Sequence, residues 1–175
     1  RMIRELTEKE QCAIHLINGQ YLHLKSAPGP INGVIHNAGY RDSAIIGEIF
    51  TDIEFLALSS NGSAASPGDY HELDIAFVEP DCVARPRHDQ IRIGIECKNT
   101  TFTKNIFRSV LGARREMGYK MGTEQGTGFL HWPRNLTYYS PPSCLLVFST
   151  DAGVNSYCKS AEFFGIDLFH LDFKE

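Results

Sequence analysis

The sequence contains no long apolar run, no paired cysteine motif and no membrane-targeting pattern. No stretch approaches the ~20 apolar residues that a membrane-spanning helix needs, and the N-terminal residues 1–4 are followed by acidic residues rather than by the apolar centre of a signal peptide. The five cysteines are odd in number and widely spaced, with no Cys-x-x-Cys pair and no histidine at zinc-site spacing. We therefore expect free thiols in a soluble, cytoplasmic protein that has no membrane partner.

Positive charge is also scarce. The chain has 17 lysines and arginines against 21 aspartates and glutamates, which gives a formal net charge of −4. Nonspecific affinity for nucleic acid comes mainly from lysine and arginine displacing counterions from phosphates, so this balance excludes a surface coated with phosphate-binding residues. Any contact with nucleic acid has to be local.

Several common catalytic signatures are missing. The glycine-rich segment 122–128 lacks the Gly-Lys-Ser/Thr ending of a phosphate-cradling loop, no serine stands in a Gly-x-Ser-x-Gly context, and the histidines show no triad or metal spacing. A nucleoside-triphosphatase and a serine hydrolase therefore have no support. As a flexible loop, 122–128 could close over a substrate, with Trp132, Tyr138 and Tyr139 as faces on which bases stack; ordinary packing is the alternative for each aromatic ring.

The composition that is present is typical of one globular domain. The chain has 175 residues, of which 42% are hydrophobic and 22% charged, and a chain of this length buries roughly 70% of its unfolded surface. We expect a single domain over residues 1–175. The arginine before Met2 and the apolar-rich C-terminal stretch are also compatible with a piece of a longer chain or of a larger complex.

Hydrophobic periodicity predicts an α/β domain. Helical spacing covers residues 7–18, a run from Asp42 or Ser43 to Leu56, residues 103–118 and residues 154–164. The period is two over residues 71–79 and 91–99, and further strand-like runs cover residues 144–150 and 167–173. This order predicts a mixed central β-sheet flanked by helices, in which the two period-two strands form a hairpin.

Three charged residues gather on the predicted hairpin. If it closes near residues 85 and 86, Asp74 lies opposite Cys97, between Glu96 and Lys98. Glu96 and Lys98 share one face because they are two residues apart in a strand, and Asp74 joins them if the register shifts by one. Two carboxylates and a lysine among apolar neighbours are costly to bury unless they pair or bind a cation. Carboxylates suit Mg²⁺ or Mn²⁺, which can polarise a phosphate and activate water.

These two strands resemble the signature of a nuclease superfamily. Residues 71–77 (HELDIAF) followed by residues 93–99 (IGIECKN) resemble the PD-(D/E)xK, or restriction-endonuclease-like, nucleases, in which an aspartate on one strand is followed by Glu-x-Lys on the next. The resemblance implies Asp74 and Glu96 as metal ligands and catalytic residues, and Lys98 as the catalytic lysine. Cys97, which stands between Glu96 and Lys98, is counted in the metal-ligand set as well. It also implies a restriction-endonuclease-like core of helix, three-stranded meander, helix and strand over about residues 43–150.

Glu48 is the candidate for one more catalytic and metal-binding carboxylate. Many members of the superfamily supply such a residue from a helix upstream, and Glu48 stands at that place in the helix expected up to Leu56. The alternative is that Glu48 only solvates this helix. The sequence departs from the signature at Leu73, which replaces the proline, and it does not identify the first strand of the meander.

A basic stripe follows the Glu-x-Lys segment. Lys104, Arg108 and Arg115 fall along one side of the predicted helix 103–118, with Arg114 adjacent. They could steer a nucleic-acid backbone towards the metal, and a solvated helix face is the alternative.

The sequence therefore predicts a Mg²⁺- or Mn²⁺-dependent endonuclease, with DNA as the expected substrate and RNA or branched junctions left open. One alternative is a catalytically silent restriction-endonuclease-like module that binds nucleic acid or protein in a larger assembly. Another alternative is a small-molecule phosphoesterase. A last alternative is that Glu96 and Lys98 are only an exposed ion pair on an edge strand, without any function. Because double-strand cleavage by one small site needs two visits or two subunits, we also expect a homodimer.

Overall fold

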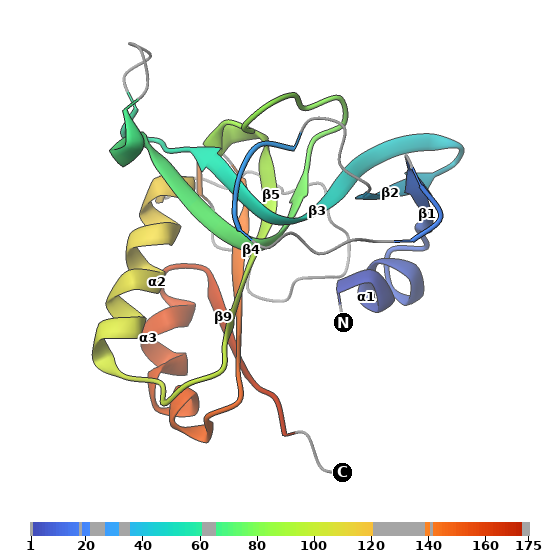
Figure 1. Ribbon diagram of the computed structural model, residues 1–175. Helices are drawn as coiled ribbons and strands as arrows, with labels where there is room; N and C mark the ends of the chain where they lie inside the picture. Colours follow the sequence, from blue (N-terminus) through green and yellow to red (C-terminus); the bar gives the residue numbers. More distant parts are fainter. Residues whose placement is uncertain are drawn as a thin grey trace.

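The computed structural model describes residues 2–17, 19–21, 27–31, 36–60, 66–120, 139–140 and 142–172. Its centre is a seven-stranded sheet in the order β1-β2-β3-β4-β5-β8-β9 (Figure 1). The strands are β1 (Ala13–Ile17), β2 (His36–Arg41), β3 (Ala44–Leu56), β4 (Tyr70–Val78), β5 (Ile91–Lys98), β8 (Cys144–Ser149) and β9 (Ile166–His170). Pairing is antiparallel from β1 to β5 and parallel from β5 to β9, so the chain has an α/β fold with a mixed sheet, as predicted.

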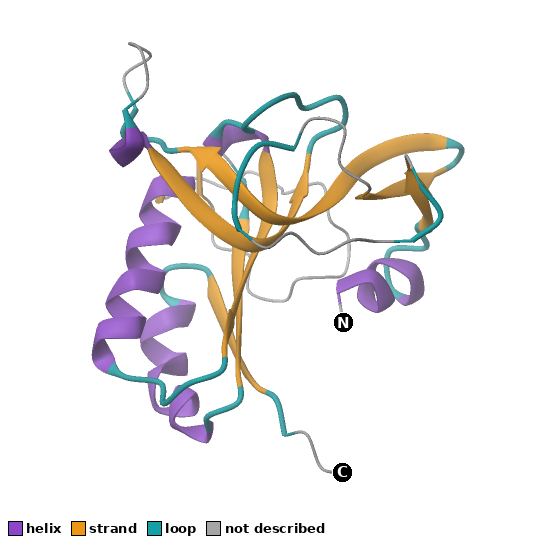
Figure 2. Ribbon diagram, viewed as in Figure 1, coloured by secondary structure: helices purple, strands orange, loops and turns teal. Residues whose placement is uncertain are grey.

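The helices lie on opposite faces of this sheet. They are α1 (Met2–Glu8), α2 (Lys104–Met117) and α3 (Cys158–Glu162), with short 3-10 helices η1 (Pro67–Asp69), η2 (His88–Gln90) and η3 (Ala152–Tyr157). Figure 2 shows α2 and α3 together on one side of the sheet and α1 at the far end, near β1. A separate two-stranded ladder joins β6 (Tyr119–Lys120) to β7 (Tyr139–Ser140).

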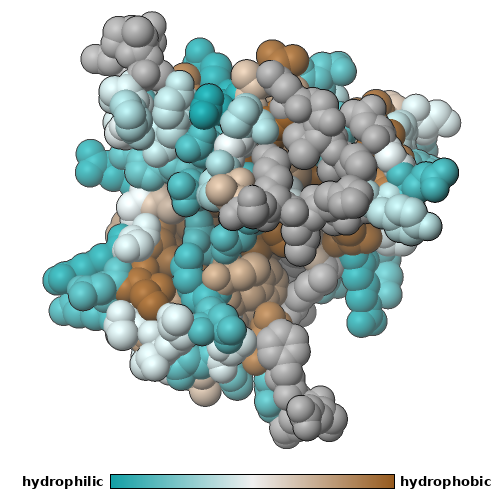
Figure 3. All heavy atoms as spheres, in the orientation of Figure 1, coloured by the Kyte–Doolittle hydropathy of each residue, from teal (hydrophilic) through white to brown (hydrophobic). Residues whose placement is uncertain are grey.

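Each face of the sheet contributes to its own apolar cluster. The cluster beneath α2 and α3 contains Phe107 and Val110 from α2 together with strand residues such as Ala76 and Leu145. The opposite cluster contains Leu6 of α1. The space-filling view shows mainly hydrophilic side chains on the outer side of the helices and apolar ones where the helices meet the sheet (Figure 3). The sheet is therefore covered on both faces at its centre, around β4, β5 and β8.

Most of the elements predicted after residue 70 are confirmed. The period-two runs at 71–79 and 91–99 form β4 and β5, the apolar runs at 144–150 and 167–173 form β8 and β9, and the run at 103–118 forms α2. Thr103 caps α2 by accepting a hydrogen bond from the Ile106 N–H through its side chain at 3.4 Å. The helix expected over 154–164 is divided between η3 and α3.

The two helices predicted before residue 60 are wrong. α1 ends at Glu8, residues 13–17 form β1, and the run ending at Leu56 is the long strand β3. Half of the apolar residues of β3 are isoleucines, whose branched side chains favour a pleated sheet over a helix. Gly47 lies where β3 meets the ring of Phe77, because a Cβ added there would be 2.4 Å from Phe77 Cζ.

The order of elements agrees with the expected core only in part. β3, β4 and β5 form a meander, α2 follows, and β8 then pairs with β5 in parallel. No helix precedes the meander directly, because β1 and β2 separate α1 from β3. The expected hairpin register is also off by one: Ile75 pairs with Ile95, and continuing that register puts Asp74 opposite Glu96 instead of Cys97.

Candidate active site

The site lies where β4 and β5 stop pairing. Their ladder ends at Ile75 and Ile95, immediately before Asp74 on one strand and Glu96 on the other. The carboxylate of Asp74 spans the opening between the strands, because its Oδ2 accepts a hydrogen bond from the backbone N–H of Cys97 at 2.5 Å. This bond orients one carboxylate towards β5 at the end of the hairpin ladder.

A local irregularity in β3 and β4 accompanies this arrangement. Asp52 has a φ of 49°, in the left-handed region that non-glycine residues rarely adopt, and it lies between the paired residues Thr51 and Ile53. On β4, Leu73 and Ala76 are three residues apart yet join the same apolar cluster, so the alternation of faces slips by one residue between them. Asp74 lies within this irregular stretch, so its side chain does not follow the regular alternation of faces along β4.

Glu96 and Lys98 form an ion pair at the end of β5. Lys98 Nζ donates a hydrogen bond to Glu96 Oε2 at 2.5 Å, and the two side chains are 13% and 28% exposed for Glu96 and Lys98, respectively. Two residues earlier on this face, Gly94 allows the sheet to approach α2, since a Cβ there would lie 3.0 Å from Met117 Cε and 3.1 Å from Leu73. The ion pair therefore lies at the border of the apolar cluster beneath α2, where solvent reaches it only partly.

The environment shifts the protonation of both partners. Burial raises the pKa of Glu96, an effect that the hydrogen bond and charge of Lys98 oppose and that the charge of Asp74 reinforces. Burial by itself would lower the pKa of Lys98, but its hydrogen bond to Glu96 and the charges of Glu96 and Asp74 outweigh burial and raise that pKa. Lys98 is thus held as an ammonium by the Glu96 carboxylate, and the charge of Asp74 adds to this effect.

The donor set of this site fits a magnesium ion. Within the described residues, Asp74 Oδ1 and Glu96 Oε1 accept no hydrogen bond, and both are hard oxygen ligands. Mg²⁺ keeps several of its waters and is commonly bound by one or two carboxylates, which matches this pair. In the part of the chain that the structure describes, no group of three or more His, Cys, Asp or Glu side chains is placed to hold a metal ion. Any ion here would rely on water or substrate for its other ligands.

Cys97 contributes to the site through its backbone. Its N–H holds Asp74, whereas desolvation and the charges of Asp74 and Glu96 raise the pKa of its thiol. A protonated thiol is a soft and weak ligand that does not suit Mg²⁺. The thiol therefore adds nothing to a magnesium site at this position.

The structure places Glu48 away from the other carboxylates. Glu48 is on β3, not on a helix, and pairs in register with Val78, four residues beyond Asp74 on β4. At about 3.3 Å per residue, four strand residues span roughly 13 Å. Its Oε1 instead lies 2.8 Å from Nε2 of His36, whose ring stacks on Phe50 with centroids 4.4 Å apart. Glu48 is thus the partner of a buried histidine.

Asp52 is the acidic residue that sequence reasoning missed. The register of β3 and β4 puts Asp52 opposite Asp74, and its charge is one of those that raise the pKa of the Cys97 thiol. In a helix over residues 43–56, Asp52 would only have faced solvent. The signal that could have found it is the run of branched residues on either side, which favours a strand and so brings Asp52 beside the hairpin.

Comparisons with protein-family models, with curated proteins and with solved structures found no match. Among the described residues, no helix is long and apolar enough to span a membrane.

The segment after Lys98 is anchored at the ends of the parallel strands. Asp151 accepts hydrogen bonds from the Gly153 N–H at 3.0 Å and the Phe102 N–H at 2.6 Å, and these two bonds lower its pKa. Thr150 Oγ1 donates to Asn99 Oδ1 at 3.0 Å. The loops that follow β5 and β8 are therefore tied to each other directly beside the candidate site.

The three basic residues proposed to contact nucleic acid are exposed on α2. Lys104, Arg108 and Arg115 form no ion pair within the described parts of the chain. Arg114, by contrast, is 2% exposed and donates hydrogen bonds to Ser143 Oγ at 2.8 Å and to the Phe164 carbonyl at 3.1 Å. The expected loop at 122–128, with Trp132 and Tyr138, lies outside the described residues, as does the side chain of Tyr139.

Proposed function

We propose that this chain is a divalent-metal-dependent endonuclease that hydrolyses phosphodiester bonds in DNA, with Asp74, Glu96 and Lys98 as catalytic residues. The observation that carries the proposal is the convergence of these three side chains where β4 and β5 part. The meander, the following helix α2 and the parallel strand β8 add support, because the resemblance to PD-(D/E)xK nucleases implies this order of elements after its first helix.

Each residue has a distinct task in this proposal. Asp74 and Glu96 hold Mg²⁺ or Mn²⁺ through the oxygens that the described residues leave without a hydrogen bond. Once bound, the ion supplies a Lewis acid that polarises the phosphate and lowers the pKa of water. Lys98, as an ammonium, offers its charge to the phosphate oxygens as negative charge builds on them. Hydrolysis forms a bond from water oxygen to phosphorus and breaks the bond to the leaving oxygen, which takes up a proton.

Asp52 joins this proposal as a positioning carboxylate. It lies opposite Asp74 in the β3–β4 register, and a carboxylate near a hydrated ion can accept hydrogen bonds from the waters that the ion retains. Asp52→Asn should weaken Mn²⁺ binding about 10-fold, the lower limit for partners outside the immediate ligand set. Glu48→Asn, on the same strand but next to His36, is the matched control, and titration calorimetry measures both variants.

Plasmid nicking tests the proposed activity. Supercoiled plasmid is incubated with the purified chain in Mg²⁺, Mn²⁺ or a chelator, alongside Lys98→Ala and the control Lys159→Ala, which alters an exposed lysine of α3. The proposal predicts nicking that depends on metal, persists in Lys159→Ala and disappears in Lys98→Ala. Absence of nicking with every metal, or equal nicking by Lys98→Ala, contradicts it.

A second candidate is a catalytically silent module that binds nucleic acid or protein within a larger assembly. The observation in its favour is the Glu96–Lys98 ion pair, which already compensates one carboxylate by a positive charge. A silent module takes up no Mn²⁺ in titration calorimetry, whereas binding that is lost in Asp74→Asn rules it out. Hydrolysis of a simple phosphodiester without cleavage of DNA would instead identify a small-molecule phosphoesterase.

The expected homodimer is tested by its mass. The chain has a mass of 19.6 kDa, so two-fold assembly, the commonest form of soluble oligomer, gives about twice that value. Light scattering that returns the monomer mass at all concentrations contradicts the dimer while leaving the catalytic proposal intact.

A further inference from the structure

A pocket opens beside the catalytic residues at the ends of β5 and β8. Its volume is about 460 Å³, and it is lined by Cys97, Lys98, Asn99, Phe148, Thr150 and Leu171. Lys98 belongs both to this pocket and to the ion pair with Glu96. A ligand that fills the pocket therefore lies next to the group proposed to contact the phosphate.

The pocket combines an aromatic wall with an amide. The ring of Phe148 stacks on that of Phe169 from β9, with centroids 4.9 Å apart and planes at 17°, so its position is fixed by the neighbouring strand. Leu171 adds a second apolar wall. At the polar side, the hydrogen bond from Thr150 to Asn99 Oδ1 orients the Asn99 amide, whose NH₂ group donates to no acceptor among the described residues.

These features match the requirements of a single nucleobase. A volume of about 460 Å³ falls within the roughly 300–1,000 Å³ of ordinary small-ligand sites, enough for one nucleotide but not for stacked base pairs. The apolar lining accepts the ring of an unstacked base, and an asparagine amide hydrogen-bonds the edge of such a base. A base within a duplex cannot enter such a pocket unless it is first unpaired and unstacked, which costs energy.

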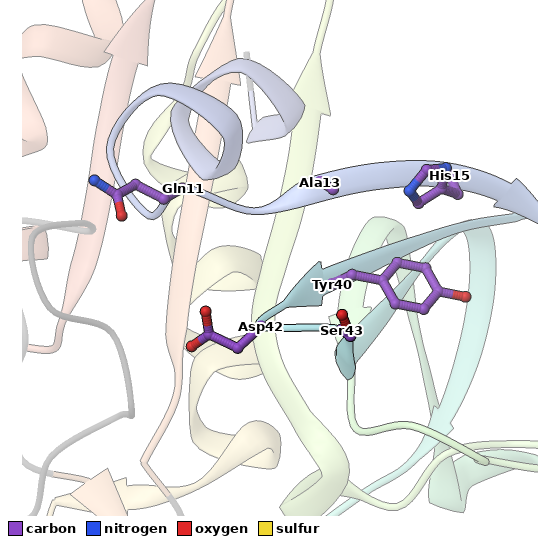
Figure 4. A pocket seen from close by; sticks show the side chains of 6 residues that line it. All are labelled: Gln11, Ala13, His15, Tyr40, Asp42 and Ser43. Carbon is purple, nitrogen blue, oxygen red and sulfur yellow. The ribbon is translucent and has the colours of Figure 1, made fainter.

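Another cavity of about 480 Å³ lacks this combination. It is lined by Gln11, Ala13, His15, Tyr40, Asp42 and Ser43. Figure 4 shows Ala13 and His15 on β1, Gln11 just before it, Tyr40 on β2, and Asp42 and Ser43 in the turn that follows β2, without a lysine or arginine. Because that lining offers no fixed positive charge to a phosphate, this cavity does not compete for the same ligand.

We propose that the pocket at Lys98 receives one base of the DNA strand whose scissile phosphate lies at Lys98, so that the enzyme acts on single-stranded or locally unpaired DNA. The inference rests on the proposed function and narrows its substrate. Asn99 is the group that contacts the base edge, and Leu171 is the apolar wall against which the base lies. The basic residues of α2 then contact the phosphate backbone of the same DNA strand beyond this base.

Oligonucleotide binding tests the inference without cleavage. The Asp74→Asn protein serves as the background, because this change removes a proposed metal ligand but no residue of the pocket. Fluorescence anisotropy then compares a labelled single strand with the duplex of the same sequence in Mg²⁺. We expect the single strand to bind at least about 10-fold more tightly, since the duplex has to unstack a base before it can bind.

Two variants in that background locate the base. Asn99→Ala should weaken single-strand binding about 5- to 10-fold through the lost amide hydrogen bonds, and Leu171→Ala should weaken it about 5-fold through the lost apolar contact with the base. Asn105→Ala is the matched control, because Asn105 is an exposed asparagine of α2. Circular dichroism of each variant shows whether it is folded, and Asn99, an exposed residue, keeps the test valid if Leu171→Ala unfolds.

The outcomes separate the inference from the proposed function. Equal affinity for single strand and duplex, or Asn99→Ala binding as tightly as Asn105→Ala, overturns the base pocket even if the parent protein cleaves DNA. Selective binding of the single strand that is lost in Asn99→Ala supports the pocket, and it does so even if the parent cleaves nothing and the catalytic proposal fails.

Discussion

Replacing Lys98 with methionine should destabilise the protein in a way that depends on pH and on metal. Methionine keeps the length and apolar stem of the side chain but removes the ammonium that donates to Glu96. A hydrogen bond to a charged group contributes about 1.5–3 kcal/mol. Because the Lys98 side chain is 28% exposed, solvent screening reduces this to about 1–2 kcal/mol. For a chain of this size, the loss lowers the melting temperature by about 2–8 °C.

The sign of the pH dependence follows from Glu96. Burial raises its pKa above the ordinary 4.5, and loss of Lys98 removes the interactions that oppose this rise. A carboxyl group with a raised pKa contributes its full stability below the unfolded value and loses that contribution as the pH rises through the folded value. The deficit of Lys98→Met relative to the parent is therefore largest at pH 7–8 and shrinks towards pH 4.

Added Mg²⁺ should restore much of the lost stability. A ligand at 100 times its dissociation constant stabilises the folded state by about 2.7 kcal/mol, and the gain should be larger in Lys98→Met because Glu96 is no longer compensated. Thermal unfolding at pH 7.5 and pH 4.5, with Mg²⁺ or chelator, measures both effects against the control Lys159→Met. A variant that melts with the parent, or whose deficit is the same at both pH values, refutes the reasoning.

Three further changes test the structure around the site. Arg114→Leu removes three hydrogen bonds that the guanidinium donates, two to Ser143 and one to the Phe164 carbonyl, and should cost about 3 kcal/mol or more in urea unfolding. A loss below about 0.5 kcal/mol, the range of surface substitutions, would contradict this role of Arg114. Gly47→Ala places a Cβ 2.4 Å from Phe77 Cζ and should cost about 1–3 kcal/mol, and unchanged unfolding by guanidinium would disprove this close approach. Two backbone N–H groups hold the pKa of Asp151 below 3.8. The stability that Asp151→Asn loses at pH 7 relative to the parent should therefore disappear at low pH, where Asp151 of the parent is protonated. A stability difference that persists in unfolding experiments at pH 2 would argue against this role of Asp151.

The candidate site was predictable where the signals are local. Alternating residues on β4 and β5 and the cap at Thr103 identify the hairpin and α2 without knowledge of the rest of the chain. The two-residue spacing puts Glu96 and Lys98 on one face, and the structure brings Asp74 to them. The register is a longer-range property that the turn decides, and the predicted value was off by one residue.

The first strand of the meander was not predictable in the same way. β3 is buried on different faces before and after Asp52, and its isoleucines at positions 45, 46, 49 and 53 imitate the spacing of a helix. β3 packs between β2, which precedes it across the turn at Asp42 and Ser43, and β4, so the irregularity is a property of the sheet and not of the local sequence pattern. Periodicity therefore assigned Glu48 to a helix and overlooked Asp52.

Metal-dependent cleavage by carboxylate variants tests the central claim most directly. A labelled single-stranded oligonucleotide is incubated with the parent, Glu96→Gln and Glu48→Gln in Mn²⁺, and the initial rates are compared. Loss of a residue that binds the metal should cost at least about 100-fold, because partners further from a metal already cost 10- to 100-fold. The account predicts that Glu96→Gln loses activity to this extent while Glu48→Gln, whose pairing with His36 lies away from the site, cleaves at nearly the parental rate. Equal rates for the parent and Glu96→Gln, or cleavage that continues in chelator, would contradict it.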